Sequence, residues 1–426
     1  MKQIIAMDYI KSKEIFLLLR DTLKLIDPRP VDHGYRVAYI IYKMFRLRGG
    51  FEEFELADYV MLATFHDLGA YKTENLNDML RYEAKVFMPH SIYGYLFYKY
   101  MCPVPDGDWP KTYLYHHMDY NQLQAMPFKY KKLVAYLNIA ERMDIYNTAL
   151  GDKFDYTMFQ KHADIRISGE GLDFFYRAEK KDHILENLRN GNFHEELDQI
   201  TQFLVFTNEY KTGYLEMLMY FLGFRSPTAV VDAVTCIHIS LQIGRQMNLS
   251  EKELDILKYA AMVHDIGMLA IPKEIIDAPR KLSAEEVRLL RTHVERTEKL
   301  LRGRMSDEVV DIALAHHERS DGSGYPKGLR SASMNLQQSI LQVADTVAGL
   351  VNDRSYRTPH SKNEVISILQ EEVKRGKYSK AIVNVFCDRY DEIMETVKAE
   401  SENVLATYDK LNKNYDLVSS QFKNTK

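Results

Sequence analysis

Cysteine, glycine and proline are scarce in this chain of 426 residues, and each scarcity excludes a class of protein. The three cysteines, Cys102, Cys236 and Cys387, are isolated and odd in number, which excludes a disulfide framework and predicts reduced thiols in a cytoplasmic protein. The 20 glycines and 12 prolines are too few for a disordered or fibrous chain. No uncharged run approaches the roughly 18 residues of a membrane span, so we expect no signal peptide and no membrane anchor.

An excess of positive charge is also lacking. The formal net charge is -4 and the pI is near 6.4, which excludes a broad basic field for binding long nucleic acid. Hydrophobic residues make up 46% of the chain, enough to bury a sizeable core.

Apolar residues recur at helical spacing almost everywhere, as in LDILKYAAMVHDIG and VISILQEEV, and strand-like alternation is rare. This pattern predicts an all-α fold. Ser250 with Glu253, and Ser283 with Glu286, have the spacing of capping boxes and predict two helix starts. The first of these helices is expected to end near His264.

Polar motifs repeat in the same order in the two halves of the chain. The first half contains VDHGYRVAYI, TFHDLGA, PHSIYGYLF, YHHMDYN and LNIAERMDIY, and the second contains VVDAVTCIHIS, MVHDIGM, RTHVERTEKLL, AHHERSDGSGYPKGL and LQVADTVAGL. We therefore predict two related helical-bundle domains, at 1–150 and 224–426, joined by a helical connector at 151–223.

Six residues of the second half have the side chains of a divalent metal site: His264, Asp265, His293, His316, His317 and Asp345. A lone histidine on an apolar helix is usually a satisfied core residue. Adjacent His-Asp and His-His pairs, however, would be left unpaired in a core unless something bound them. Imidazole with carboxylate suits Mn, Fe, Zn or Ni better than Mg or Ca. Two such ions support in-line hydrolysis of a phosphate ester without a covalent nucleophile.

The second half resembles the HD-GYP phosphodiesterases, from about Phe224 to Ser367, through HDIG, IPKEII, RKLSAEE, a lone His, HHERSDGSGYPKGL, VAD and DRSYR. The resemblance implies hydrolysis of cyclic di-GMP, or of cyclic GMP-AMP, to linear products by two divalent ions, with Mn or Fe ahead of Zn or Ni. It implies that the six residues are metal ligands, and we place His264, Asp265, His316 and His317 at the catalytic centre. The signature loop falls on Gly324, Tyr325 and Pro326.

The residues of this loop also suit a binding role on their own. Three glycines in DGSGYPKG allow close backbone approach to a ligand, and Tyr325 offers a face for stacking a base; the alternative is a surface turn. Arg354 and Arg357 lie nine and twelve residues after Asp345, on one face if the helix continues, where they would contact phosphate. The alternative for these two is a solvated helix end.

Three positions depart from the family pattern. The family's His about 32 residues before HDIG is Asp232 here, which we expect to substitute as a metal ligand. Thr228 stands where a Glu is frequent, so two ions are expected and not three. Met268 replaces the usual Lys after HDIG and removes a cation that would help to hold phosphate.

The first half resembles an HD domain without the glycine loop. A second candidate metal set comprises His33, His66, Asp67, His90, His116, His117 and Glu141, with Asp144 competing for the role of Glu141. Either this domain binds metal and hydrolyses another substrate, or it is a regulatory copy that forms a homodimer, and we favour the second reading. Two other functions stay open: a catalytically weak receptor for a cyclic dinucleotide, and a nucleotide phosphohydrolase that uses the first-half site.

Overall fold

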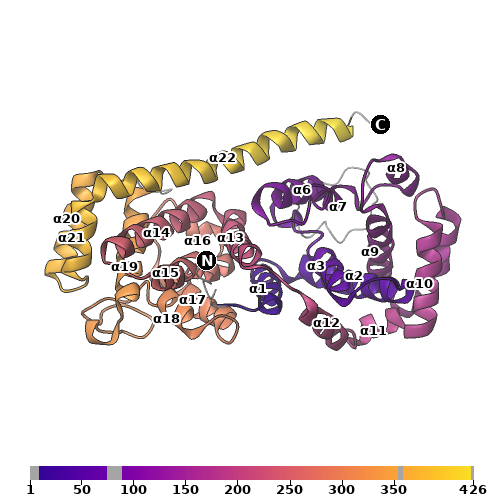
Figure 1. Cartoon of the computed structure of the whole chain (residues 1–426), viewed down its shortest axis with the longest axis horizontal. Coiled ribbons are helices and arrows are strands. Elements are labelled where there is room, and N and C mark those ends of the chain that lie inside the picture. The colour runs from indigo at the N-terminus through magenta and orange to yellow at the C-terminus, as the bar shows by residue number, and fades with distance from the viewer. Residues whose placement is uncertain (1–8, 74–88, 354–357, 424–426) are drawn as a thin grey trace, which may run out of the picture. The chain divides into compact units, whose positions relative to one another are not determined.

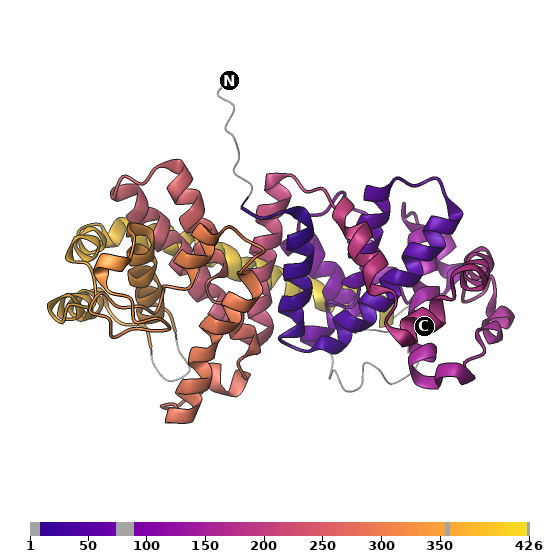
Figure 2. The ribbon, with the colours of Figure 1, turned by 90° about the horizontal axis from the view of Figure 1, so that it is seen from below.

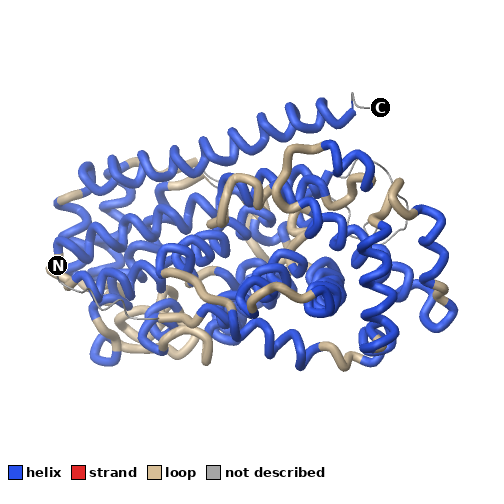
Figure 3. The backbone as a smooth tube through the Cα atoms, turned by 45° about the vertical axis from the view of Figure 1, so that its right-hand side comes forward, coloured by secondary structure: helices blue, strands red, loops and turns tan. Residues whose placement is uncertain are grey.

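The computed structural model describes residues 9–73, 89–353 and 358–423. Within these ranges the regular structure is helical, and β pairing is limited to isolated bridges (Figure 3). The predicted all-α fold is confirmed. The described chain forms two compact units: residues 26–210 with 410–423, called the first-half unit, and residues 9–25 with 211–409, called the second-half unit.

The first-half unit is built around α2, which packs against α3 and α9, while α10 lies on α2 and α9 (Figures 1 and 2). Its helices are α2 (Pro28–Arg48), α3 (Glu53–Thr64), α4 (Ala70–Thr73), α6 (Pro89–Met101), α7 (Lys111–Tyr115), α8 (Tyr120–Ala125), α9 (Lys131–Leu150), η1 (Gly151–Lys153), η2 (Tyr156–His162), α10 (Gly169–Asp182), α11 (Ile184–Asn190), α12 (His194–Ile200) and η3 (Thr201–Phe203).

The second-half unit is built in the same way around α14, which packs against α15 and α19 (Figure 1). Its helices are α1 (Ser12–Lys24), α13 (Asn208–Arg225), α14 (Pro227–Gln246), α15 (Glu251–Val263), η4 (Ile266–Ala270), α16 (Lys273–Ile276), α17 (Ala284–Leu301), α18 (Asp307–Ala313), η5 (Ser331–Ser333), α19 (Leu336–Val351), α20 (Lys362–Lys374), α21 (Lys380–Asp388) and α22 (Tyr390–Lys423). The last residues of α22, from 410 onward, are grouped with the first-half unit.

Both predicted capping boxes are present. The Ser250 side chain accepts from the backbone N–H of Glu253, the Ser283 side chain does the same for Glu286, and each glutamate accepts from the backbone N–H of its serine. These caps satisfy N–H groups that the first turn leaves without partners. As expected from its start, α15 ends at His264.

The compact units group the residues differently from the ranges 1–150, 151–223 and 224–426. Residues 151–210 are helical, but they belong to the first-half unit because α10 and α11 bury Leu172, Phe175 and Leu185 and pack against α2 and α9. Helix α1, which lies in the predicted range 1–150, packs against α17 and η4 and so belongs to the second-half unit. Where independently folding domains begin and end remains a prediction.

A glycine in each His-Asp motif brings the same two elements together. A Cβ atom at Gly69 would collide with the backbone carbonyl of His90, and one at Gly267 would collide with that of His293. Only glycine permits this close approach of the turn to the next histidine-bearing helix. The repeated motifs therefore produce the same local packing in both units.

None of the described helices combines the length and the apolar character that crossing a bilayer requires.

Candidate metal centres

In the second-half unit, four elements carry the predicted metal ligands. His264 and Asp265 lie where α15 ends and η4 begins, and His293 lies in the middle of α17. His316 and His317 follow α18, and Asp345 lies in the third turn of α19.

Asp265 is the centre of this cluster. Its Oδ1 atom is 3.3 Å from Nε2 of His293 and 3.5 Å from Nε2 of His316. Its Oδ2 atom is 3.5 Å from Nε2 of His264. One carboxylate therefore faces histidines from three elements, as a ligand shared by two ions would.

Asp345 completes the cluster from the other side. Its Oδ1 atom lies 3.8 Å from Nε2 of His264, and its Oδ2 atom lies 3.5 Å from Nδ1 of His317. The ligand atoms form two groups in which all atoms lie within 4.8 Å of one another: His264 with Asp265 and Asp345, and His293 with His316 and His317. The structure thus brings together all six residues that the sequence singled out.

Backbone carbonyls orient the imidazoles toward the centre. Nδ1 of His264 lies 2.8 Å from the carbonyl oxygen of Ala261, and Nδ1 of His316 lies 2.7 Å from that of Ala313. His293 has the same contact, at 2.6 Å, three residues back along its helix. A carbonyl oxygen can only accept, so Nδ1 carries a proton and Nε2 is the nitrogen that each ring directs toward the centre.

The electrostatics of the cluster fit a bound cation. Burial, together with the neighbouring imidazoles, lowers the pKa of His316 well below its usual range. Burial of His264 acts to lower its pKa, but Asp265 and Asp345 outweigh this effect and raise the pKa to about 9. Asp265 Oδ1 is buried and lacks a hydrogen-bond partner. A buried carboxylate oxygen without a donor is costly, and a divalent ion at this position removes the cost.

The glycine loop is held beside the cluster by Glu318. Its buried carboxylate accepts from the backbone N–H groups of Lys327, at 2.7 Å, and Leu329, at 2.8 Å. A Cβ atom at Gly324 would collide with the backbone of Glu318 and its neighbour, so the loop can cross here only with glycine.

The loop places Tyr325 against His317, one of the candidate metal ligands. The backbone N–H of Tyr325 donates to the carbonyl of His317 at 3.1 Å, and the two rings lie 4.7 Å apart between centroids. The guanidinium of Arg291 lies 4.7 Å from the centroid of the Tyr325 ring. The loop is therefore part of the site and is not a separate surface turn.

A cavity of about 640 Å³ opens onto the cluster. Its lining includes the candidate ligands Asp265, His293, His317 and Asp345, together with Tyr325. It also includes Thr228, Asp232 and Met268, the three positions that depart from the family pattern. This volume lies within the ~300 to 1,000 Å³ of small-molecule sites.

Asp232 lines the cavity but belongs to neither ligand group. Its Oδ1 atom accepts a hydrogen bond of 2.9 Å from the side-chain amide of Asn352, which also contacts the Thr235 hydroxyl at 3.1 Å. His238, six residues further along α14, is absent from both groups as well. The role of Asp232 as a metal ligand stays a prediction, and Arg354 and Arg357 lie outside the described residues.

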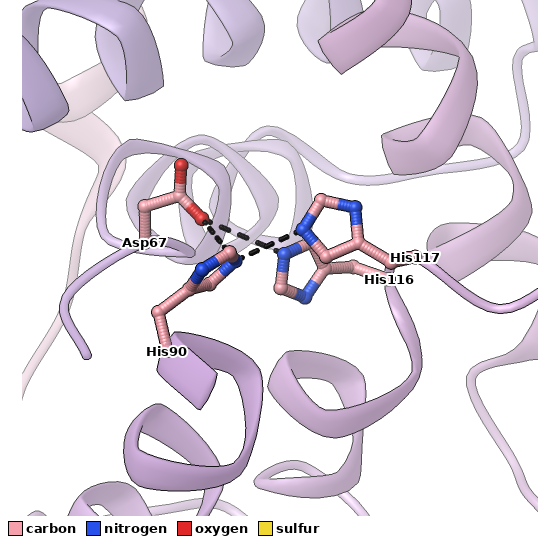
Figure 4. Close-up of side chains that lie close together, drawn as sticks. All are labelled: Asp67, His90, His116 and His117. Atoms are coloured by element: carbon pink, nitrogen blue, oxygen red, sulfur yellow. Dashed lines mark hydrogen bonds and ion pairs between the residues drawn. The ribbon is translucent and has the colours of Figure 1, made fainter. Parts of the chain in front are cut away.

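The first-half unit repeats the arrangement (Figure 4). Oδ1 of Asp67 lies 3.3 Å from Nε2 of His90 and 3.5 Å from Nε2 of His116. Nε2 of His90 lies 2.9 Å from Nε2 of His117. These four residues, from the α3–α4 turn, α6 and the end of α7, form one ligand group.

A second ligand group lies on the other side of Asp67 and comprises His33, His66 and Glu141. Oδ2 of Asp67 is 3.3 Å from Nε2 of His66 and 3.8 Å from Nε2 of His33. Glu141 is 3.3 Å from Nδ1 of His117.

Asp144 takes a different place from Glu141. Its Oδ2 atom is 2.7 Å from Nδ1 of His33, and it accepts from Arg36 at 2.7 and 3.0 Å. Asp144 therefore orients a candidate ligand from behind, and Glu141 lies among the ligands.

Three residues that contribute to the second-half site were missed by the sequence reasoning: Glu318, Arg291 and Thr297. The buried Thr297 hydroxyl ties α17 to the turn between α15 and η4, because it donates to the carbonyl of His264 at 3.1 Å and accepts from the N–H of Gly267 at 3.0 Å. Only Glu318 had a sequence signal, since an acid directly follows the His-His pair in the half that has the glycine loop. Arg291 and Thr297 occupy helix positions that spacing alone does not distinguish.

Comparison with known proteins agrees with this geometry. The sequence model of the HD domain family matches residues 216–382. Over 419 residues the chain is 25% identical to the 3'3'-cGAMP-specific phosphodiesterase 1 of Vibrio cholerae serotype O1, covering 92% of this chain and 95% of the relative. Over 143 residues it is 35% identical to a cyclic di-GMP phosphodiesterase response regulator of Xanthomonas campestris, covering 33% of this chain and 37% of the relative.

A solved structure extends the likeness to the fold of nearly the whole chain. The crystal structure of a cyclic GMP-AMP-specific phosphodiesterase of V. cholerae aligns with a TM-score of 0.56 and 15% identity. The alignment covers 89% of this chain and 97% of that chain.

Proposed function

We propose that this chain is a phosphodiesterase of the HD-GYP group and that its second-half unit hydrolyses a cyclic dinucleotide to a linear product. The observation that carries the proposal is the clustering of six histidine and aspartate side chains, with Asp265 facing three of the histidines, at the wall of a cavity that Tyr325 also lines. Cyclic di-GMP and 3'3'-cGAMP are the two substrates, since they are the ones that the relatives are named for.

The site is proposed to hold two divalent transition-metal ions, Mn or Fe ahead of Zn or Ni. His264, Asp265 and Asp345 would hold one, and His293, His316 and His317 the other, with Asp265 between them. When bound, two such ions lower the pKa of water and stabilise charge on the attacking and leaving oxygens of an in-line displacement.

The protein's own part is to fix the ligands and to orient the substrate. The carbonyl contacts behind His264, His293 and His316 keep their Nε2 atoms directed inward. Tyr325, which contacts His317 and Arg291 and lines the cavity, would stack on a base of the substrate, and stacking of this kind contributes about 1 to 3 kcal/mol. Arg354 and Arg357 are proposed as phosphate contacts on the sequence argument alone.

The test is turnover by the full chain. Protein loaded with Mn²⁺ or Fe²⁺ is incubated with cyclic di-GMP or with 3'3'-cGAMP, and the products are separated by ion-exchange chromatography. We expect a linear dinucleotide from at least one substrate and none from the double variant His264→Ala and Asp265→Ala. His238→Ala, which removes a histidine outside both ligand groups, is the matched control and should retain activity. If the metal-loaded wild type linearises neither compound, the proposal is wrong.

A further inference from the structure

We propose that the first-half unit holds a dinuclear metal centre of its own, with Asp67 as the shared ligand. One ion would bind among Asp67, His90, His116 and His117, and the other among His33, His66 and Glu141, with Asp67 reaching it through its second oxygen. With five imidazoles and two carboxylates, the donor set suits borderline ions such as Zn²⁺, Fe²⁺ or Co²⁺ better than Mg²⁺ or Ca²⁺. The proposal concerns metal binding and does not depend on the activity proposed above.

The spacing of the donor atoms is the first support. Two ligands 2.0 to 2.2 Å from one ion, at angles between tetrahedral and octahedral, are themselves about 2.8 to 3.6 Å apart. His90 and His117 are separated by 2.9 Å between their Nε2 atoms, and Asp67 lies 3.3 and 3.5 Å from its two nearest imidazoles in the same group. The donors are therefore already placed at ligand-to-ligand distances.

The orientation of the rings is the second support. Nδ1 of His66 lies 2.7 Å from the carbonyl of Ala63, and Nδ1 of His116 lies 2.7 Å from that of Tyr113. Each ring therefore keeps its proton on the outer nitrogen and directs the Nε2 lone pair inward. His33 is fixed in the same way by the carboxylate of Asp144. Outer partners of this kind are typical of metal-bound histidines.

The third support is that acceptors face acceptors. Nε2 of His66, Nε2 of His116 and Oδ1 of Asp67 are all buried and have no hydrogen-bond partner. The Nε2 atom of His66 lies 3.3 Å from Oδ2 of Asp67, and the Nε2 atom of His116 lies 3.5 Å from its Oδ1. Lone pairs opposed at this distance in a dry interior are unfavourable, and a cation between them turns the repulsion into bonds.

The buried position predicts what bound metal does here. Of the candidate ligands that carry this proposal, His117 has the most exposed side chain at 17%, and Asp67 is 6% exposed. The chain continues from His117 with Met118, without a glycine loop, so nothing matches the substrate-facing loop of the second half. A closed site of this kind contributes its binding energy to folding. We therefore expect the ions to stabilise the first-half unit.

Metal content of the full chain tests the proposal. Protein stripped with a chelator is reloaded with Zn²⁺, freed of excess ion and measured by plasma mass spectrometry. Wild type should retain about four ions, two for each dinuclear centre, and the double variant His66→Ala and Asp67→Ala should retain about two. His264→Ala with Asp265→Ala is the reciprocal variant and should also retain about two. His162→Ala, a first-half histidine outside both groups, should match wild type.

A milder variant guards against loss of folding. His117→Ala removes the most exposed of these histidines. We expect this variant to keep the helical circular dichroism of wild type and to bind about one ion fewer. Zn²⁺ should raise the Tm of the variant much less than it raises the Tm of wild type, measured at the lowest unfolding transition. The proposal is overturned if His117→Ala and the His66/Asp67 variant both bind as much Zn²⁺ as wild type. It is also overturned if all bound Zn²⁺ disappears from the His264/Asp265 variant. Neither result depends on whether a cyclic dinucleotide is hydrolysed.

Discussion

In the first-half unit the carboxylate of Asp67 is 6% exposed, whereas the matching Asp265 of the second-half unit is 27% exposed. The last carboxylates of the two clusters follow the same trend, with Glu141 at 9% and Asp345 at 20%. The two units thus share the pattern of candidate ligands, but the carboxylates are more accessible to solvent in the second-half unit. Metal coordination needs converging donors, but hydrolysis also needs a space in which the substrate meets them.

The residue after each His-His pair also differs between the two units. Glu318 anchors the glycine loop through two backbone N–H groups, and the first half has Met118 at the same place, which has no carboxylate to offer. The ligand sets alone therefore do not separate a catalytic centre from a closed one. The anchored loop, which Glu318 holds beside the second-half cluster, does separate the two.

The largest expected effect on the rate of hydrolysis comes from replacing the central aspartate of each cluster by asparagine. Asp265→Asn removes the negative charge that faces two ligand groups and should lower hydrolysis of the cyclic dinucleotide at least about a thousandfold, because metal-based charge stabilisation provides several kcal/mol. Asp67→Asn should lower it by less than about tenfold, through reduced stability of the first-half unit. Initial rates under metal-saturating conditions give both values. An equal loss in the two variants would show that both centres take part in the reaction.

The candidate ligands of both units could be predicted from the sequence, whereas the unit boundaries could not. The six second-half candidate ligands and the seven first-half candidates can be found from the sequence because adjacent polar pairs in apolar helices have few structural explanations. The choice between Glu141 and Asp144 is not readable, since both lie one turn apart on α9 and only the packing of α2 directs Asp144 to His33 and Arg36. The unit boundaries were equally hidden, because α1 and α10 are amphipathic helices whose partners are set by tertiary packing.

A smaller effect is expected from releasing the loop while keeping the metal ligands. Glu318→Gln replaces one acceptor oxygen by an amide that faces a backbone N–H, so one of the two anchoring bonds is lost. We expect turnover to fall about 10- to 100-fold, since a displacement of the order of 1 Å at a site can cost that much, with metal content unchanged. Glu308→Gln, an exposed acid on α18, is the control and should have no effect. Loss of bound metal together with activity would mean that Glu318 supports the ligands themselves.

The smallest and most diagnostic effect concerns Asp232, which stands in the second half where the first half has the candidate ligand His33. A carboxylate makes a bound ion a weaker Lewis acid than a neutral imidazole does and favours harder ions such as Mn²⁺. Asp232→His also gives up the hydrogen bond from Asn352, worth about 1 kcal/mol. We therefore expect activity within about threefold of wild type or higher, with the preference moved from Mn²⁺ toward Fe²⁺ or Zn²⁺, and the reverse shift in the first-half unit for His33→Asp. Asp232→Ala should lose one of the two second-half ions. If Asp232→Ala keeps both ions and Asp232→His leaves the metal preference as it was, Asp232 acts through Asn352 on the end of α19 and is not a ligand.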